Sequence, residues 1–252
     1  MGEKALGFGV DVGGSGVKGA VVDLATGQFV GERALIATPQ PATPAAIAEV
    51  VAQIVGACGW DGPVGITLPS VITGQVAHTA ANIDPTWVGT NVHDLFANAL
   101  STAEVSVLND ADAAGIAEVA FGNQTARTGA VIFLTFGTGI GSAFLRDGTL
   151  FPNTELGHMR IDGTEAEHLA SSAVRDREAL SYEDWAQRVD TVLHEYARLF
   201  NPSAFIVGGG ISSDAEKWVP LLSVDVPVVP AALRNRAGIV GAAMAAHDHV
   251  AP

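Results

Sequence analysis

The stretch ALGFGVDVGGSGVKG at residues 5–19 decides the fold. Residues 14–19 match the pattern G-x-G-x-x-G, which in dinucleotide-binding folds follows a strand and opens a helix. Alternating apolar and small residues at 5–12 predict the strand. No helix follows, because residues 20–23 read Ala-Val-Val-Asp and Thr26-Gly27 makes the next turn. The sequence therefore predicts a strand, a glycine turn, a second strand, a turn and a third strand.

The glycine turn has two interpretations. In a tight glycine hairpin a ligand can approach the backbone closely, and successive N–H groups can point at an anion. The same residues are equally typical of an ordinary hairpin that binds nothing, because a single glycine motif is weak. This stretch alone leaves both interpretations open.

The hairpin is repeated about 120 residues later. A strand at 129–136 leads into Gly137-Thr138-Gly139-Ile140-Gly141, and a second strand follows at 142–146. Two lobes of similar topology, each with a glycine hairpin, can face each other across a cleft and hold a chain of phosphates between them. Further strands are predicted at 29–36, 63–68, 105–108, 149–150 and 204–207, and helices at 45–57, 92–100, 113–121, 181–200 and 237–247.

Composition excludes several classes of protein. The 252 residues are enough for one domain or two compact lobes. No apolar run approaches the roughly 20 residues of a membrane span, and Met1 to Ala5 lead straight into a strand, so we expect no signal peptide and a cytoplasmic location. The net charge of −14 argues against nucleic acid or an anionic membrane as partner. The single cysteine, Cys58, can form neither an internal disulfide nor a cysteine-rich zinc site.

Asn109-Asp110-Ala111-Asp112 directly follow a predicted buried strand. Asn and Asp are common helix caps at such a junction, which explains one of the acids. Ligands of open α/β sheets bind beyond the carboxyl ends of the strands. Asp110 is therefore well placed to act as a general base on a hydroxyl group.

Glu155-Leu156-Gly157-His158 lie in a loop after the second hairpin. Glu accepts hydrogen bonds and His both donates and accepts, so the pair suits adjacent hydroxyl groups. A metal site is less favoured, because no further ligands follow at helical spacing.

Lys18 is either a solvated lysine or a charge partner for phosphate. Arg234 and Arg236 are either a solvated pair flanking a helix or a grip on phosphates.

Together these segments resemble the ROK family of sugar kinases, within the actin-like (hexokinase–Hsp70) superfamily. The matching segments run in family order and span nearly the whole chain: 11–18 (DVGGSGVK), 109–115 (NDADAAG), 136–142 (FGTGIGS), 155–158 (ELGH), 207–212 (VGGGIS) and 237–243 (AGIVGAA). The resemblance implies an α/β, actin-like, two-lobed ATPase fold with a central cleft. Residues 1–108 with 236–252 would form the small N-terminal lobe and 109–235 the large C-terminal lobe.

Within the family the chain looks most like the polyphosphate glucokinases. It is short, and the stretch 159–167 has no cysteine where most ROK members carry a zinc loop, so no structural zinc is expected. Leu233-Arg234-Asn235-Arg236 are basic where ATP-using relatives are commonly less so, and residues 80–84 resemble the sugar-side loop.

The resemblance implies phosphoryl transfer from inorganic polyphosphate to the 6-hydroxyl of glucose, and leaves open whether ATP also serves as donor. Asp110 would be the catalytic base, Asp11 would place Mg²⁺, and a homodimer is the family expectation. Sugar hydroxyls would be bound by Asn82, Asn109, Asp110, Glu155, His158 and Glu167, and phosphates by Gly13, Gly14, Ser15, Gly16, Lys18, Gly137, Thr138, Gly139, Arg234 and Arg236.

Alternatives and departures remain. A strictly ATP-dependent ROK glucokinase or another hexose kinase is the nearest alternative, and the chain's acidity favours it mildly. A sugar-sensing regulator is disfavoured, because the first strand begins too early for an N-terminal DNA-binding module and the charge opposes DNA. Ser15 replaces the commoner threonine but keeps the hydroxyl, and Phe136 replaces leucine. Ser70 stands where the family usually has glycine, so a different local backbone is expected there. Pocket contacts of about 1–3 kcal/mol separate glucose from mannose or glucosamine, below what motifs resolve.

Overall fold

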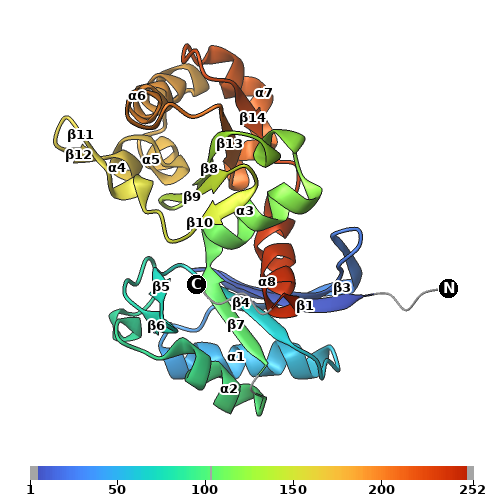
Figure 1. Ribbon diagram of the computed structural model, residues 1–252. Helices are drawn as coiled ribbons and strands as arrows, with labels where there is room; N and C mark the ends of the chain where they lie inside the picture. The colour runs from blue at the N-terminus through green and yellow to red at the C-terminus, as the bar shows by residue number, and fades with distance from the viewer. Residues whose placement is uncertain (1–4, 103, 249–252) are drawn as a thin grey trace. The chain divides into compact units, whose positions relative to one another are not determined.

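The computed structural model describes residues 5–102 and 104–248. It divides into two compact units (Figure 1). The first unit runs up to Ala117 and resumes at Arg236, and the second is Glu118–Asn235. The boundary between them falls inside the helix Asp110–Phe121.

The first unit is built on a five-stranded sheet of order β3-β2-β1-β4-β7. β1, β2 and β3 are antiparallel, while β4 and β7 continue the sheet parallel to β1. The predicted strand–glycine turn–strand–turn–strand is confirmed. The elements are β1 Leu6–Val12, β2 Gly16–Asp23, β3 Gln28–Ala37, α1 Pro44–Ala57, β4 Val64–Leu68, β5 Ile72–Thr73, β6 Val76–Ala77, η1 Pro85–Trp87, α2 Val92–Leu100, β7 Val105–Asn109, α3 Asp110–Phe121 and α8 Ala237–His247.

Helices cover both faces of this sheet: α1 and α2 lie on one side and α8 on the other (Figure 1). α1 begins as predicted, with Thr43 as N-cap accepting a hydrogen bond from the Ala46 N–H at 3.3 Å and Pro44 in the first turn. The core of this unit gathers apolar side chains of the strands, α1 and α2, among them Phe8, Ile54 and Phe96.

The close approach of α8 explains the small residues in and around it. A Cβ added to Gly65 on β4 would lie 1.8 Å from the carbonyl oxygen of Ala242 on α8, and one on Gly9 of β1 would lie 1.9 Å from that of Ile239. Helix and sheet therefore touch backbone to backbone, which only glycine permits. The predicted small-residue helix at 237–247 is confirmed with the same bounds.

The second unit repeats the strand pattern of the first. Its sheet has the order β10-β9-β8-β13-β14, with β10, β9 and β8 antiparallel and β13 and β14 parallel to β8. The repetition predicted from the glycine hairpins thus extends to the whole sheet. The elements are η2 Gln124–Arg127, β8 Ala130–Phe136, β9 Ile140–Arg146, β10 Thr149–Phe151, η3 Leu156–His158, β11 Arg160–Ile161, β12 Thr164–Glu165, α4 Ala166–Ala170, α5 Ser172–Arg177, α6 Tyr182–Phe200, β13 Ala204–Gly208, η4 Gly210–Asp214, α7 Ala215–Trp218, η5 Val219–Leu221 and β14 Val228–Pro230; η6 Arg234–Arg236 lies at the junction of the units.

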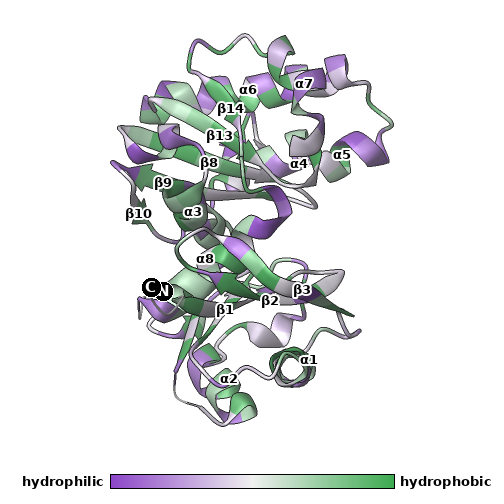
Figure 2. Ribbon diagram, turned by 90° about the vertical axis from the view of Figure 1, so that its right-hand side faces the viewer, coloured by the Kyte–Doolittle hydropathy of each residue, from purple (hydrophilic) through white to green (hydrophobic). Residues whose placement is uncertain are grey.

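The core of the second unit is a cluster of aromatic rings beneath α6. Phe136, Trp185 and Trp218 are fully buried, with ring centroids 5.0–5.9 Å apart in edge-on contacts. The Ser181 hydroxyl accepts from the Asp184 N–H at 3.1 Å, which confirms it as the predicted cap of α6. β8, β13 and α8 are coloured mainly as hydrophobic in Figure 2, as buried elements should be.

Two smaller findings complete the fold. Among residues 5–102 and 104–248, no helix is both long and apolar enough to span a membrane. Helix α3 begins at Asp110, three residues before the predicted start, because the Asn109 side chain caps it directly at the end of β7.

Candidate active site

The first glycine turn joins β1 to β2. The Gly13 N–H donates to the carbonyl oxygen of Gly16 at 3.1 Å, and the hydroxyl of Thr38, the residue after β3, donates to the Gly13 carbonyl oxygen. Gly14 and Ser15 at its tip are exposed. A Cβ on Gly14 would lie 3.3 Å from the carbonyl oxygen of Asn82, so the tip lies against the predicted sugar-side loop. The turn is thus a fixed backbone with an accessible tip, as an anion cradle requires.

Asp11 and Lys18 face each other across the hairpin beside this turn. They are paired in the β1–β2 register, and the Lys18 Nζ lies 3.5 Å from Asp11 Oδ2. The Thr67 hydroxyl on β4 donates to Asp11 Oδ1 at 3.1 Å, which holds the carboxylate from the other side. Both charged side chains are partly exposed. A carboxylate and an ammonium group therefore lie side by side at the glycine-turn end of the sheet.

Asn109 and Asp110 stand at the carboxyl end of β7. Asn109 is buried, and its Oδ1 accepts from the N–H groups of Ala111 and Asp112 at 2.9 and 3.1 Å. Its Nδ2 donates to the carbonyl oxygen of Ser70 at 3.2 Å. Asp110 is half-buried in the first turn of α3, where its Oδ1 accepts from the Ala111 N–H at 2.9 Å. Asn109 thus fixes the start of the helix that carries Asp110.

Ser70, which was singled out because glycine is more usual at this position, anchors the segment that follows it. Its side chain is 1% exposed, and the hydroxyl donates to the carbonyl oxygen of Thr79 at 2.7 Å. This bond closes the segment that contains β5 and β6. Asn82, just beyond it, is exposed with a left-handed backbone (φ 59°). The structure therefore brings Asn82 next to the first glycine turn and Asn109 next to Ser70.

The second glycine turn, in the second unit, joins β8 to β9. The Gly137 N–H donates to the Gly139 carbonyl oxygen at 3.0 Å, and the Ser172 hydroxyl donates to the Gly137 carbonyl oxygen at 2.9 Å. Thr138 at the tip is exposed. The Glu167 carboxylate lies against the turn, where its Oε2 is 3.4 Å from the Ile140 N–H nitrogen. The structure thus places a predicted sugar ligand beside a predicted phosphate turn.

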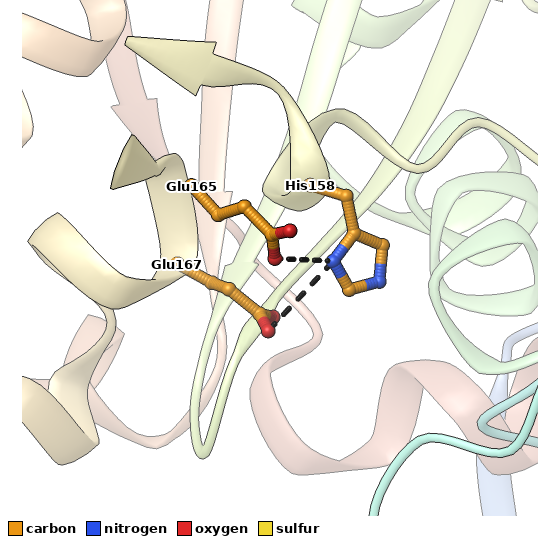
Figure 3. A group of neighbouring side chains, drawn as sticks. All are labelled: His158, Glu165 and Glu167. Atoms are coloured by element: carbon orange, nitrogen blue, oxygen red, sulfur yellow. Dashed lines mark hydrogen bonds and ion pairs between the residues drawn. The ribbon is translucent and has the colours of Figure 1, made fainter. Parts of the chain in front are cut away.

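Carboxylates lie close to both ring nitrogens of His158, and Figure 3 shows two of them, Glu165 and Glu167. Its Nδ1 lies 3.1 Å from Glu165 Oε2 and 3.8 Å from Glu167 Oε1, and its Nε2 lies 3.8 Å from Glu155 Oε2. One ligand atom from each of His158, Glu165 and Glu167 lies within 4.8 Å of the others, a spacing that a metal ion could use. The loop that carries His158 is held by the Tyr196 hydroxyl, which donates to the Leu156 carbonyl oxygen at 2.6 Å.

These contacts shift the pKa values of the cluster. Burial raises the pKa of Glu155 above its usual value, and the charge of Glu167 adds to that rise while His158 opposes it. Burial by itself would lower the pKa of His158, but the hydrogen bond to Glu165 and the charges of Glu167 and Glu155 outweigh it and raise the pKa. The hydrogen bond from His158 lowers the pKa of Glu165. The cluster therefore favours a proton on His158 over one on Glu165.

The two arginines have different surroundings. Arg234 is exposed, has a left-handed backbone (φ 53°), and lines an open pocket of about 470 Å³ with Ser212, Ser213 and Glu216. Arg236 lies in the first unit, where its Nη1 donates to Gln28 Oε1 at 2.7 Å. Phosphate binding by either arginine stays a prediction.

Three supporting residues were not predicted from the sequence. Glu165 lies two residues before Glu167, and only the short β11–β12 hairpin brings it to His158. Thr67 reaches Asp11 from a neighbouring strand. Glu118 is fully buried and accepts from the N–H groups of Asn123, Ala232 and Leu233 at 2.7–3.2 Å, which anchors the segment just before Arg234. The only sequence signal for Glu118 is an acid on an otherwise apolar helix face.

Comparisons with known proteins agree with these features. A model of the ROK family matches residues 7–174. The polyphosphate glucokinase of Mycobacterium tuberculosis (strain ATCC 25618 / H37Rv) is 54% identical over 239 residues, which cover 95% of this chain and 90% of that protein.

Solved structures are similar over nearly the whole chain. The inorganic polyphosphate/ATP-glucomannokinase from Arthrobacter sp. strain KM is 45% identical with a TM-score of 0.93, covering 98% of this chain and 100% of that one. A ROK family glucokinase from Streptomyces griseus, in complex with glucose and AMPPNP, is 26% identical with a TM-score of 0.81, covering 97% of this chain and 100% of that one.

Proposed function

The chain belongs to the ROK family, and we propose that it transfers a phosphoryl group from inorganic polyphosphate to the 6-hydroxyl of glucose, giving glucose 6-phosphate. The similarity to the mycobacterial polyphosphate glucokinase supports both the donor and the acceptor, because it extends over 95% of the chain. The Arthrobacter enzyme, whose name includes ATP and mannose, supports ATP as a second donor and a wider sugar range.

The strand order of the first unit supports the roles proposed for the first glycine turn and for Asp110. β1, β4 and β7 are parallel neighbours, so their carboxyl ends lie at one edge of the sheet. The first glycine turn follows β1, and Asn109 with Asp110 closes β7. An anion cradle and a fixed carboxylate at the same edge suit transfer of a phosphoryl group to a hydroxyl.

The proposed step needs little covalent chemistry from the protein. The 6-hydroxyl oxygen of glucose attacks the terminal phosphorus of the donor, its proton passes to the Asp110 carboxylate, and the shortened donor leaves. The Ala111 N–H holds Asp110 Oδ1 at the start of α3, which orients the carboxylate. Backbone N–H groups at Gly14 and Ser15 and the Lys18 ammonium group would bind the phosphate oxygens, with Gly13 and Gly16 shaping the turn.

Sugar recognition is divided between hydrogen-bond donors and acceptors. In the first unit Asn82 and Asn109 would bind hydroxyls beside Asp110. In the second unit Glu155, His158 and Glu167 form one cluster with both kinds of group, as adjacent sugar hydroxyls require. Gly137, Thr138, Gly139, Arg234 and Arg236 are the remaining proposed phosphate ligands.

Asp11 is the proposed residue for Mg²⁺. Its carboxylate is 22% exposed and already oriented by Thr67, which fits an ion that keeps several waters and takes one or two carboxylates. Lys18 at 3.5 Å would share the phosphate charge with the ion. When bound, Mg²⁺ neutralises charge on the transferring phosphoryl group.

The donor and the base are tested together. The purified protein is assayed with glucose and either polyphosphate or ATP, coupled to oxidation of glucose 6-phosphate. We expect activity with polyphosphate, and Asp110→Asn should keep the fold but reduce kcat by about 100-fold or more. The matched control is Asp94→Asn, which changes an exposed acid in the first turn of α2.

The outcomes separate the alternatives. Turnover with ATP alone would replace the proposed donor by that of a strictly ATP-dependent kinase, and no product with either donor would overturn the function. Near-normal turnover of Asp110→Asn would exclude Asp110 as the base. A homodimer also remains part of the proposal, and light scattering measures it directly.

A further inference from the structure

His158 makes its shortest side-chain contact with a residue outside the Glu-x-Gly-His motif. Its Nδ1 lies 3.1 Å from Glu165 Oε2, whereas the motif's own acid, Glu155, lies 3.8 Å from Nε2. Glu167 is also 3.8 Å away, from Nδ1. Among residues 5–102 and 104–248, Glu165 is thus the acid at hydrogen-bond distance from this ring.

The backbone is folded to create this contact. β11 and β12 form a two-residue hairpin in which Arg160 pairs with Glu165, and the turn at Asp162 and Gly163 is left-handed at both positions (φ 49° and 86°). The Ala166 N–H then donates to the Met159 carbonyl oxygen at 2.9 Å. The chain therefore returns to His158 seven residues later, in a geometry fixed by the hairpin.

A carboxylate on one ring nitrogen determines what the other nitrogen can do. The carboxylate only accepts, so the Nδ1 that faces it carries a proton, and in the neutral ring Nε2 is then a hydrogen-bond acceptor. Figure 3 shows Nε2 pointing away from Glu165 and Glu167. The acid beside Nε2 is Glu155, whose Oε2 lies 3.8 Å away, beyond hydrogen-bond distance, and the His158 side chain is 49% exposed.

We propose that Glu165 is a positioning residue that keeps the proton on Nδ1 of His158 and so presents Nε2 as an acceptor for a sugar hydroxyl. This role depends on the proposed sugar binding by His158. Glu165 does not touch the sugar; it fixes the orientation and tautomer of the side chain that does, as carboxylates do for histidines in many sites.

The groups facing His158 also define the competing explanation. Glu155 precedes η3, Glu165 ends β12 and Glu167 lies on α4, so three acids from three segments surround the ring. A metal ion held by His158, Glu165 and Glu167 would bind Nδ1 without its proton. The protonation of Nδ1 therefore separates a positioning carboxylate from a metal site.

Two measurements test the role of Glu165. Long-range ¹⁵N–¹H NMR of the wild-type protein, with the His158 signals assigned from His158→Gln, reports which nitrogen carries the proton. Steady-state kinetics then compares Glu165→Gln with the wild type. The control is Glu195→Gln, since Glu195 has the same 28% side-chain exposure, is also paired with a basic side chain, Arg198, and lies on α6.

We expect a proton on Nδ1 in the wild type and a mixed tautomer in Glu165→Gln. The KM for glucose should rise roughly tenfold at nearly unchanged kcat and unchanged KM for polyphosphate, the loss expected for one charge-assisted hydrogen bond. Glu195→Gln should behave like the wild type in all three respects.

Several results would overturn the role of Glu165. These are an unprotonated Nδ1 in the wild type, a stoichiometric metal ion in the purified protein whose removal changes the His158 signals, or an unchanged glucose KM in Glu165→Gln. If glucose is not a substrate at all, the NMR experiment still decides whether Glu165 sets the tautomer of His158. Failure of the proposed function is therefore distinguished from failure of the proposed role of Glu165. If Glu165→Gln does not fold, the wild-type spectrum and Glu165→Asp provide the test.

Discussion

Asn109 and Ser70 are joined by a buried hydrogen bond, in which the Asn109 Nδ2 donates to the Ser70 carbonyl oxygen at 3.2 Å. The same side chain caps α3 through its Oδ1. One residue therefore ties the end of β7, the start of the helix that carries Asp110 and the segment that leads to Asn82. The connection of these three segments therefore depends on both the Nδ2 and the Oδ1 of the Asn109 amide group.

Asn109→Ala removes both interactions. We expect a loss of roughly 2 kcal/mol in the free energy of unfolding, about half from the helix cap and half from the bond to Ser70. Asn109→Ser should lose about half as much, since a serine can still cap the helix. Urea unfolding of both variants measures this. Asn98→Ala, which changes an exposed asparagine of α2, is the control and should not lower the free energy of unfolding. An equally small effect of Asn109→Ala would contradict the role of Asn109 in both the helix cap and the bond to Ser70.

Gly65→Ala tests the contact between β4 and α8. The new Cβ would lie 1.8 Å from the Ala242 carbonyl oxygen, so helix and sheet must separate. We expect a loss of about 3 kcal/mol or more. Gly56→Ala is the matched control, because it lies in α1 with no atom within 4 Å of its added Cβ, and should stabilise the protein by up to about 1 kcal/mol. Thermal unfolding compares them, and similar melting temperatures would contradict the packing described.

The features that could be predicted from the sequence are those that depend on a local pattern of residues. Both glycine hairpins, the caps Thr43 and Ser181, and α2 and α8 with their bounds follow from residues close together in the chain. Contacts between distant residues left no such signal. Arg236 meets Gln28 across 208 residues, and nothing near either of them indicates it. The β11–β12 hairpin was missed because two-residue strands are too short to show alternation, and Glu165 was missed with it.

Glu118 is the clearest example of such a distant contact. Its buried carboxylate accepts from three backbone N–H groups, two of them 114 and 115 residues away. Glu118→Ala would leave these donors buried without their partner and should cost roughly 3 kcal/mol or more. Glu49→Ala, on the exposed face of α1, should change little. A loss of less than about 1 kcal/mol in chemical unfolding would show that Glu118 does not anchor this segment.

The raised pKa of His158 predicts a pH dependence of stability. A histidine whose folded pKa lies above its ordinary value of 6.5 stabilises the folded state fully below pH 6.5, and that contribution is lost as pH rises through the raised pKa. The wild type should therefore lose stability relative to His158→Gln as pH increases from 6.5 upward. Unfolding of both proteins across this range measures the free energy of unfolding of the wild type minus that of His158→Gln. An increase of this value with pH would contradict the predicted direction.

Transfer of phosphate from polyphosphate to glucose can be observed in a single reaction by ³¹P NMR. The protein is incubated with glucose, Mg²⁺ and polyphosphate in the absence of nucleotide. We predict that the signal of glucose 6-phosphate appears while an equal amount of phosphate disappears from the polyphosphate chain. Release of free phosphate without a sugar ester, or an unchanged spectrum, would show that the protein does not transfer phosphate from polyphosphate to glucose.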